Sequence, residues 1–191
     1  MYTTLNEIRT HCPCSEGIET LMSNLGKIDQ DEHISFETIL KSNGVYDAVW
    51  GLRCAKELDV KRVFRFLSLC MTASDTLRNN KDISWVANII EFLAYGGEVC
   101  FDEMKQIQHD FALKRGSLNE MSEPGDYTSS DVLRTASDLL VLHTTTSEEV
   151  IPRRGFYGIT FALFVYTAKM IPGTAREVAG LLAGRFVECF L

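Results

Sequence analysis

A chain of 191 residues, of which 46% are hydrophobic and 24% charged, is long enough to bury a sizeable core and too apolar to stay disordered. The net charge of −7 disfavours direct nucleic-acid binding, because that binding depends on clustered Lys and Arg side chains. An acidic protein is suited instead to a basic protein partner.

The first 44 residues contain the signals of three short helices. Helices are predicted over residues 5–12, 16–25 and 36–42. Their predicted N-caps are Thr3 or Thr4, Ser15 and Ser35. The N-terminus lacks the apolar stretch and the small-residue cleavage site of a signal peptide. We therefore expect a cytoplasmic protein whose six cysteines are reduced.

The sequence RTHCPCSEG, residues 9–17, brings His11, Cys12 and Cys14 within four residues of one another. Structural zinc needs four ligands, usually in two pairs, and the sequence has no second Cys or His pair. Redox cysteines are typically spaced C-x-x-C, and a Cys12–Cys14 disulfide would close a strained ring. Because Pro13 disfavours helical geometry at Cys12, we interpret the segment as a turn between two helices, with no metal and no cofactor.

Apolar residues recur at the helical period from residue 45 to residue 115. Helices are predicted over residues 45–58, 59–79, 83–95 and 99–115. Residues 116–130 concentrate Gly, Pro, Ser and Asn and are predicted as a loop. Four cysteines stand singly among apolar neighbours and are expected in the core: Cys54, Cys70, Cys100 and Cys189.

Three helices are predicted after this loop, over residues 129–146, 157–171 and 174–191. The apolar run of residues 155–171 is shorter than the roughly 20 residues of a membrane span and includes Lys169, so we expect a buried helix and no membrane contact. No alternation of apolar and polar residues predicts a strand. The predicted fold is all-α, a compact bundle of about nine helices. Residues 1–115 and the apolar helices of residues 131–191 pack into one domain.

Asp47, Trp50 and Arg53 lie on one predicted helix and are candidate site residues. Asp47 is in the first helical turn, where a carboxylate interacts favourably with the helix dipole. Trp50 and Arg53 are three residues apart and can stack cation over ring. Because no nucleophile or second carboxylate accompanies them, we interpret all three as structural. The sequence contains no known catalytic motif, so no catalytic residues are assigned.

Acidic residues gather in the first 40 residues, where seven carboxylates and two basic side chains leave −5 of the total charge of −7. The candidate partner-binding residues are Asp29, Asp31, Glu32 and Glu37. Such a cluster can steer a Lys- and Arg-rich partner, such as a nucleic-acid-binding host protein. A solvated surface without a partner explains the same composition, and both interpretations stay open.

Residues 43–53, NGVYDAVWGLR, resemble the NGLDDALWCLRA signature of a family of small helical proteins from bacteria, prophages and phages. Members are called hypothetical or putative immunity proteins. The opening TLNEIRTHCPCSEG is similar to the family's TLNEIR…SPC-x-x-G start, and residues 63–77 and 87–104 are similar to its next two helical blocks. The resemblance covers residues 4–111 and fades beyond Gly116. It implies a helical fold and a mobile-element setting in a bacterial host cell, and no catalytic mechanism.

The leading hypothesis is a non-enzymatic interaction protein of phage or mobile-element origin. It would occlude its partner, as immunity, anti-CRISPR and anti-restriction proteins do. A second hypothesis is a structural or regulatory homo-oligomer, such as a homodimer, whose apolar C-terminal helices pack across the interface. Gly180, Ala183 and Gly184 would then permit close helix approach. A third is an enzyme whose active site is assembled from distant residues.

Overall fold

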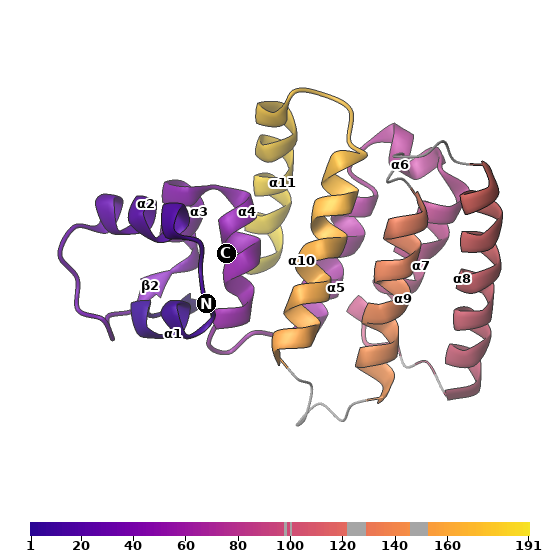
Figure 1. The fold of residues 1–191 in the computed structure, drawn as a ribbon, viewed down its shortest axis with the longest axis horizontal. Coiled ribbons are helices and arrows are strands. Elements are labelled where there is room, and N and C mark those ends of the chain that lie inside the picture. The colour runs from indigo at the N-terminus through magenta and orange to yellow at the C-terminus, as the bar shows by residue number, and fades with distance from the viewer. Residues whose placement is uncertain (98, 100, 122–128, 146–152) are drawn as a thin grey trace.

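The structure is a computed structural model that describes residues 1–97, 99, 101–121, 129–145 and 153–191. Within these ranges the chain forms eleven α-helices, one 3-10 helix and two strands of two residues each (Figure 1). The all-α fold class is therefore confirmed, and the described helices are somewhat more numerous than the roughly nine expected. The N-terminal elements are β1 (Tyr2–Thr3), α1 (Leu5–Thr10), α2 (Ser15–Leu25), β2 (Ile34–Ser35), α3 (Phe36–Asn43), α4 (Val45–Gly51) and the 3-10 helix η1 (Leu52–Cys54). They are followed by α5 (Val60–Met71), α6 (Asp75–Asn79), α7 (Lys81–Ala94), α8 (Phe101–Met121), α9 (Ser129–Thr145), α10 (Arg153–Lys169) and α11 (Ala175–Phe190).

Two predicted helices are divided in the structure. The helix predicted over residues 59–79 breaks after Met71, because Ser74 adopts an extended conformation and its side chain accepts a hydrogen bond from the Leu77 N–H, which starts α6. The helix predicted over residues 45–58 ends earlier, at Gly51, and continues only as η1. Lys56 then donates its backbone N–H to the Tyr2 carbonyl oxygen at 2.9 Å.

The prediction of no strands missed a small antiparallel pair. Thr3 is opposite Ile34, and Tyr2 is opposite Ser35. Strands of two residues are too short to show the alternation that identifies a strand in a sequence. This pair fixes the N-terminus beside the start of α3, where Thr3 and Ile34 are buried.

Two predicted boundaries need correction. The N-cap of α2 is Cys14 and not Ser15, because the Cys14 Sγ accepts a hydrogen bond from the Gly17 N–H at 3.3 Å. The loop predicted over residues 116–130 is shorter, because α8 continues to Met121 and α9 begins at Ser129. A single glycine at position 116 costs only about 1 kcal/mol in a helix, which is too little to end one. Residues 122–128 lie outside the described ranges.

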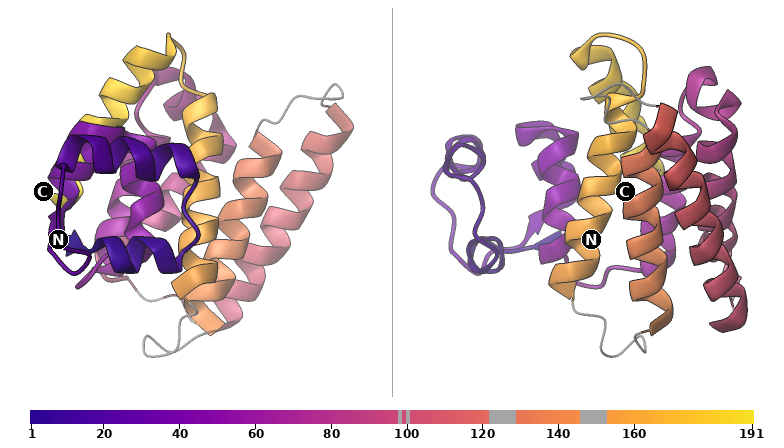
Figure 2. Two further views of the ribbon diagram at one scale, coloured as in Figure 1. Left: turned by 60° about the vertical axis from the view of Figure 1, so that its left-hand side comes forward. Right: turned by 45° about the vertical axis from the view of Figure 1, so that its right-hand side comes forward.

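The helix α5 lies at the centre of the fold, packed against α7, α10 and α11 (Figures 1 and 2). On α5, the side chains of Val63, Phe66 and Cys70 are completely buried. Phe66 contacts the rings of Phe164 on α10 and Phe186 on α11, with centroids 5.7 Å apart in both pairs. The core therefore joins α5 of the N-terminal region to the C-terminal helices α10 and α11.

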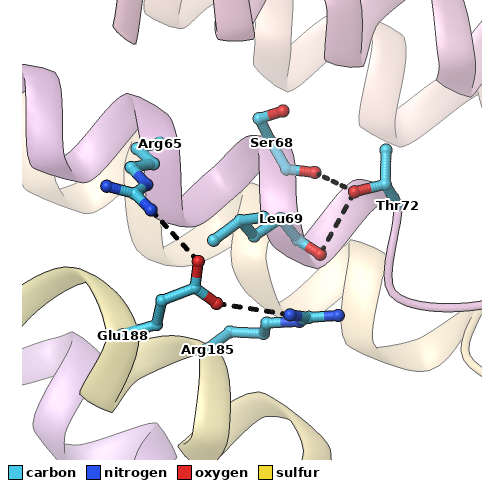
Figure 3. A network of polar contacts seen from close by, with 6 residues as sticks. All are labelled: Arg65, Ser68, Leu69, Thr72, Arg185 and Glu188. Atoms are coloured by element: carbon cyan, nitrogen blue, oxygen red, sulfur yellow. Dashed lines mark hydrogen bonds and ion pairs between the residues drawn. The ribbon is translucent and has the colours of Figure 1, made fainter.

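Polar contacts at the protein surface also link α5 to α11, as Figure 3 shows. Glu188 on α11 accepts hydrogen bonds from Arg65 on α5 at 3.1 Å and from Arg185 at 3.3 Å. At the C-terminal end of α5, the hydroxyl of the C-cap residue Thr72 donates to the Ser68 carbonyl oxygen at 2.9 Å. Because the three charged side chains are more than a third exposed, water weakens the ion pairs, and the aromatic core sets the position of α11.

The apolar run of residues 155–171 forms most of α10, and one side of this helix is buried as predicted. In α10, Phe156, Leu163 and Phe164 are at most 1% exposed. This helix packs against α4, η1, α5 and α9. None of the helices in the described ranges has the length and apolar character needed to cross a membrane.

Candidate functional site

A cavity of about 220 Å³ lies where the connection between α1 and α2 meets α3, α4 and α10. Its floor is made of Ile8, Leu21, Ile39 and Gly51, all of which are buried. The remaining lining residues are partly or fully exposed and form the mouth. The polar side chains among them are Cys14, Asn43 and Asp47, and the aromatic ones are Trp50 and Phe161. The left view of Figure 2 shows the α1–α2 connection next to α10, from which Phe161 comes.

Asn43 connects the two sides of the cavity mouth. Its side-chain Nδ2 donates to the Gly17 carbonyl oxygen on α2 at 2.7 Å and to the Asp47 Oδ2 on α4 at 2.8 Å. Its Oδ1 accepts a hydrogen bond from the Ser42 hydroxyl. One amide therefore positions both α2 and the carboxylate of Asp47, since two of its hydrogen bonds lead to different helices.

Gly17 allows α2 to approach this carboxylate closely. A Cβ atom at position 17 would lie 3.0 Å from the Asp47 Oδ2 and 3.1 Å from the Cys14 Sγ. These separations are shorter than ordinary van der Waals contact. Gly17 near the start of α2 and Asn43 at the end of α3 therefore both lie beside the Asp47 carboxylate and pack as one unit.

The predicted stacking of Arg53 on Trp50 is present. The Arg53 guanidinium carbon lies 4.6 Å from the Trp50 ring centroid, and its Nε donates to the Trp50 carbonyl oxygen at 2.9 Å. Trp50 is partly buried and lines the cavity, and Asp47 occupies the first turn of α4 as predicted. Arg53 itself does not line the cavity.

The predicted turn at residues 9–17 is confirmed: α1 ends at Thr10, and Cys12 has a φ of 53°. Cys12 and Cys14 are both exposed free thiols. Within the described ranges, no group of three or more His, Cys, Asp or Glu side chains is arranged to bind a metal ion. Of the four cysteines expected in the core, Cys54, Cys70 and Cys189 are buried, and Cys100 lies outside the described residues.

Asp29, Asp31 and Glu32 lie in the loop between α2 and β2, Glu37 lies in the first turn of α3, and all four are exposed. The Asp29 Oδ1 accepts the Asp31 N–H at 2.9 Å, and the Asp31 Oδ1 accepts the Asn6 amide at 2.6 Å. Glu37 pairs with Lys41 at 2.6 Å, which lowers the pKa of the Glu37 carboxyl. Three of the four carboxylates therefore have local partners, and Glu32 makes none of these contacts.

A second hollow, an open groove of about 490 Å³, lies between α7 and α8. Trp85, Ile89 and Phe92 line its α7 side, and Phe92 is 53% exposed. The sequence gives no sign of this groove, because a partly exposed Phe on a helix follows the same period as a buried one.

Comparisons of the chain with models of protein families, with curated proteins and with solved structures found no match. The cavity lining has one carboxylate, together with a thiol, an amide and an indole. These groups can recognise a polar ligand, but they do not form a pair of a general acid and a general base. The volume of the cavity is below the roughly 300–1,000 Å³ of most small-molecule sites, so it fits one side chain or a small ion better than a nucleotide.

Proposed function

We propose that this protein is a non-enzymatic interaction protein of phage or mobile-element origin, which inhibits a basic partner by covering its surface. The observation that supports it best is the acidic character of the N-terminal region, which has most of the net charge. Asp29, Asp31, Glu32 and Glu37 are all exposed, and only Glu37 has a basic partner among these contacts. Exposed carboxylates attract a Lys- and Arg-rich surface before contact and orient it.

The arrangement of these carboxylates also favours binding. The hydrogen bonds from Asn6 and from the Asp31 N–H fix the loop between α2 and β2 without neutralising Asp29 or Asp31. A fixed loop loses little conformational entropy when a partner binds it. The resemblance of residues 4–111 to putative immunity proteins is consistent with this kind of function.

The test is a pull-down from a bacterial lysate that contains CRISPR and restriction systems, with elution at increasing salt. The test variant replaces the charges and keeps the hydrogen-bond acceptors: Asp29→Asn, Asp31→Asn and Glu32→Gln. The control variant makes three equal charge changes at exposed carboxylates on other helices: Glu91→Gln, Asp102→Asn and Asp138→Asn.

We expect a stoichiometric basic partner that elutes from the native protein and the control at moderate salt, and from the test variant at clearly lower salt. Equal retention by both variants would rule out the acidic surface as the interface. A functional assay of the captured partner, with and without the protein, then measures the inhibition directly.

One observation favours the second candidate, a homo-oligomer. The outer face of α11 exposes Leu181, Val187 and Leu191 beside Gly180 and Gly184. A Cβ atom at either glycine would have no neighbour within 4 Å, so the described packing of the chain does not require them. Sedimentation equilibrium over a range of concentrations distinguishes a monomer from a dimer.

A further inference from the structure

The cavity beside the α1–α2 connection has one charged side chain in an otherwise neutral lining. Asp47 is the only Asp, Glu, Lys or Arg among its described lining residues. Its floor is formed by the branched side chains of Ile8, Leu21 and Ile39. A charge next to apolar walls is weakly screened, so it discriminates strongly between ligands of different charge.

Within the part of the chain that the structure describes, the Asp47 carboxylate accepts a hydrogen bond from a neutral donor and forms no ion pair. Its hydrogen bond in the described part of the chain comes from the Asn43 amide at 2.8 Å, and no Lys or Arg there lies within 4.0 Å of it. The Arg53 guanidinium lies over the Trp50 ring, with its carbon 4.6 Å from the ring centroid. The negative charge at the mouth is therefore available to a cation from outside.

The buried and the partly exposed lining residues differ in polarity, and this difference sets the orientation of a ligand in the cavity. The apolar residues of the floor are buried, whereas Asp47, Asn43 and Trp50 are partly exposed at the mouth. A cation with an apolar group can therefore fill the floor while its charge stays beside the carboxylate. The indole of Trp50 adds a second group that attracts cations.

We propose that this cavity binds a branched aliphatic ammonium ion, with its apolar group on the floor and its nitrogen donating to the Asp47 carboxylate. A primary ammonium provides three donors, one of which the carboxylate accepts, and water at the open mouth solvates the others. This chemistry occurs in a free alkylamine and at the N-terminus of a polypeptide that begins with Leu. The inference concerns a different surface from the acidic one and does not depend on the proposed function.

The experiment is an NMR titration that follows the indole N–H of Trp50. The chain has two Trp residues, so Trp85→Phe leaves Trp50 as the only indole signal. The probes are isopentylammonium chloride, its neutral analogue isopentanol, and the peptide Leu-Gly-Gly. Each is added to the Trp85→Phe protein, and to the same protein with Asp47→Asn or with Asp102→Asn, an exposed carboxylate on α8 that serves as the control.

We expect a saturable shift with isopentylammonium and an affinity about tenfold or more above that of isopentanol, since hydrogen bonds to charged groups are the stronger ones. Asp47→Asn should abolish this preference, and Asp102→Asn should retain it. Asparagine preserves an acceptor for Asn43, and circular dichroism checks that the variant folds. Binding of Leu-Gly-Gly with the same preference identifies a polypeptide N-terminus as the ligand, and binding of the amine alone identifies a free amine.

The proposal is overturned if isopentylammonium gives no saturable shift, or if isopentanol binds equally well in the folded protein. It is also overturned if Asp47→Asn leaves the preference unchanged. Because the probes are small molecules, these outcomes are independent of the pull-down that tests the acidic surface.

Discussion

The Arg53 guanidinium stacks over the Trp50 ring, 4.6 Å from its centroid, and also donates to the Trp50 carbonyl oxygen at 2.9 Å. Trp50 also lines the cavity near the end of α4, so the stacked guanidinium covers a residue of the cavity lining. Stacking of this kind contributes about 0.5–1 kcal/mol at a partly exposed site. Trp50 therefore joins the hydrophobic core to the mouth of the cavity.

Trp50→Ala is expected to lower the free energy of unfolding by about 2–3 kcal/mol. Removal of a buried aromatic costs about 3–5 kcal/mol, and the Trp50 ring is only partly buried. Urea denaturation measures the change, with Trp50→Phe as a control that retains a ring. An unchanged midpoint for Trp50→Ala would show that the ring does not stabilise the fold.

Asn43→Ala is expected to cost about 1–3 kcal/mol, because the partly buried Asp47 and the Gly17 carbonyl oxygen lose their donor together. The matched control is Asn24→Ala. The Asn24 amide also donates to a carbonyl oxygen, that of Thr20 at 2.9 Å, but on an exposed helix surface. Thermal denaturation should show a much smaller loss for Asn24→Ala, and equal losses would contradict the role given to Asn43.

Local features of the fold could be predicted where a few neighbouring residues determine them. Ser35 caps α3, as expected, and its side chain accepts from the Thr38 N–H. Asp47 lies in the first turn of α4, and Trp50 stacks with Arg53 three residues later. Each of these features depends on residues within one helical turn. Over that length, the separation of two residues in the sequence determines whether their side chains are neighbours in the structure.

The cavity could not be predicted, because its parts are distant in the sequence. Asn43 bonds to Gly17 across 26 residues, and Phe161 reaches the same mouth from α10. The resemblance put Cys14 in one block and both Asn43 and Asp47 in another, and it gave no indication that the two blocks meet. Tertiary packing, and not periodicity, brings them together.

Thiol reactivity is expected to divide the described cysteines into two groups. Burial raises the pKa of Cys54 to about 12, that of Cys189 to about 11 and that of Cys70 well above its usual value. Because the thiolate is the reactive form, these three should resist alkylation at pH 8 in the folded protein. Cys12 and Cys14 are exposed and should react within minutes.

Mass spectrometry of the digested protein after brief treatment with iodoacetamide locates the modified residues. Repetition in urea provides the control, since all buried thiols become accessible there. Rapid modification of Cys70 under native conditions would contradict its position in the core.

Replacement of a helical glycine by alanine should raise the stability of the protein at two positions and lower it at a third. Gly180 and Gly184 are exposed in α11 with no atom within 4 Å of a new Cβ, so each change to Ala should raise stability by about 0.5–1 kcal/mol. Gly17→Ala should lower it, because the new Cβ lies 3.0 Å from the Asp47 Oδ2, which Asn43 fixes in place. Urea denaturation of the three variants at low protein concentration measures these changes, and a stabilised Gly17→Ala would show that the carboxylate can move.

The same α11 variants test self-association at high concentration. If the exposed face of α11 pairs closely with a second copy, added methyl groups at Gly180 and Gly184 separate the two helices, because small residues permit the close approach. The double variant would then be more stable as a monomer and weaker as a dimer. Sedimentation equilibrium gives the dimer affinity, and an unchanged affinity would remove this face of α11 as the interface and leave its glycines without a role in assembly.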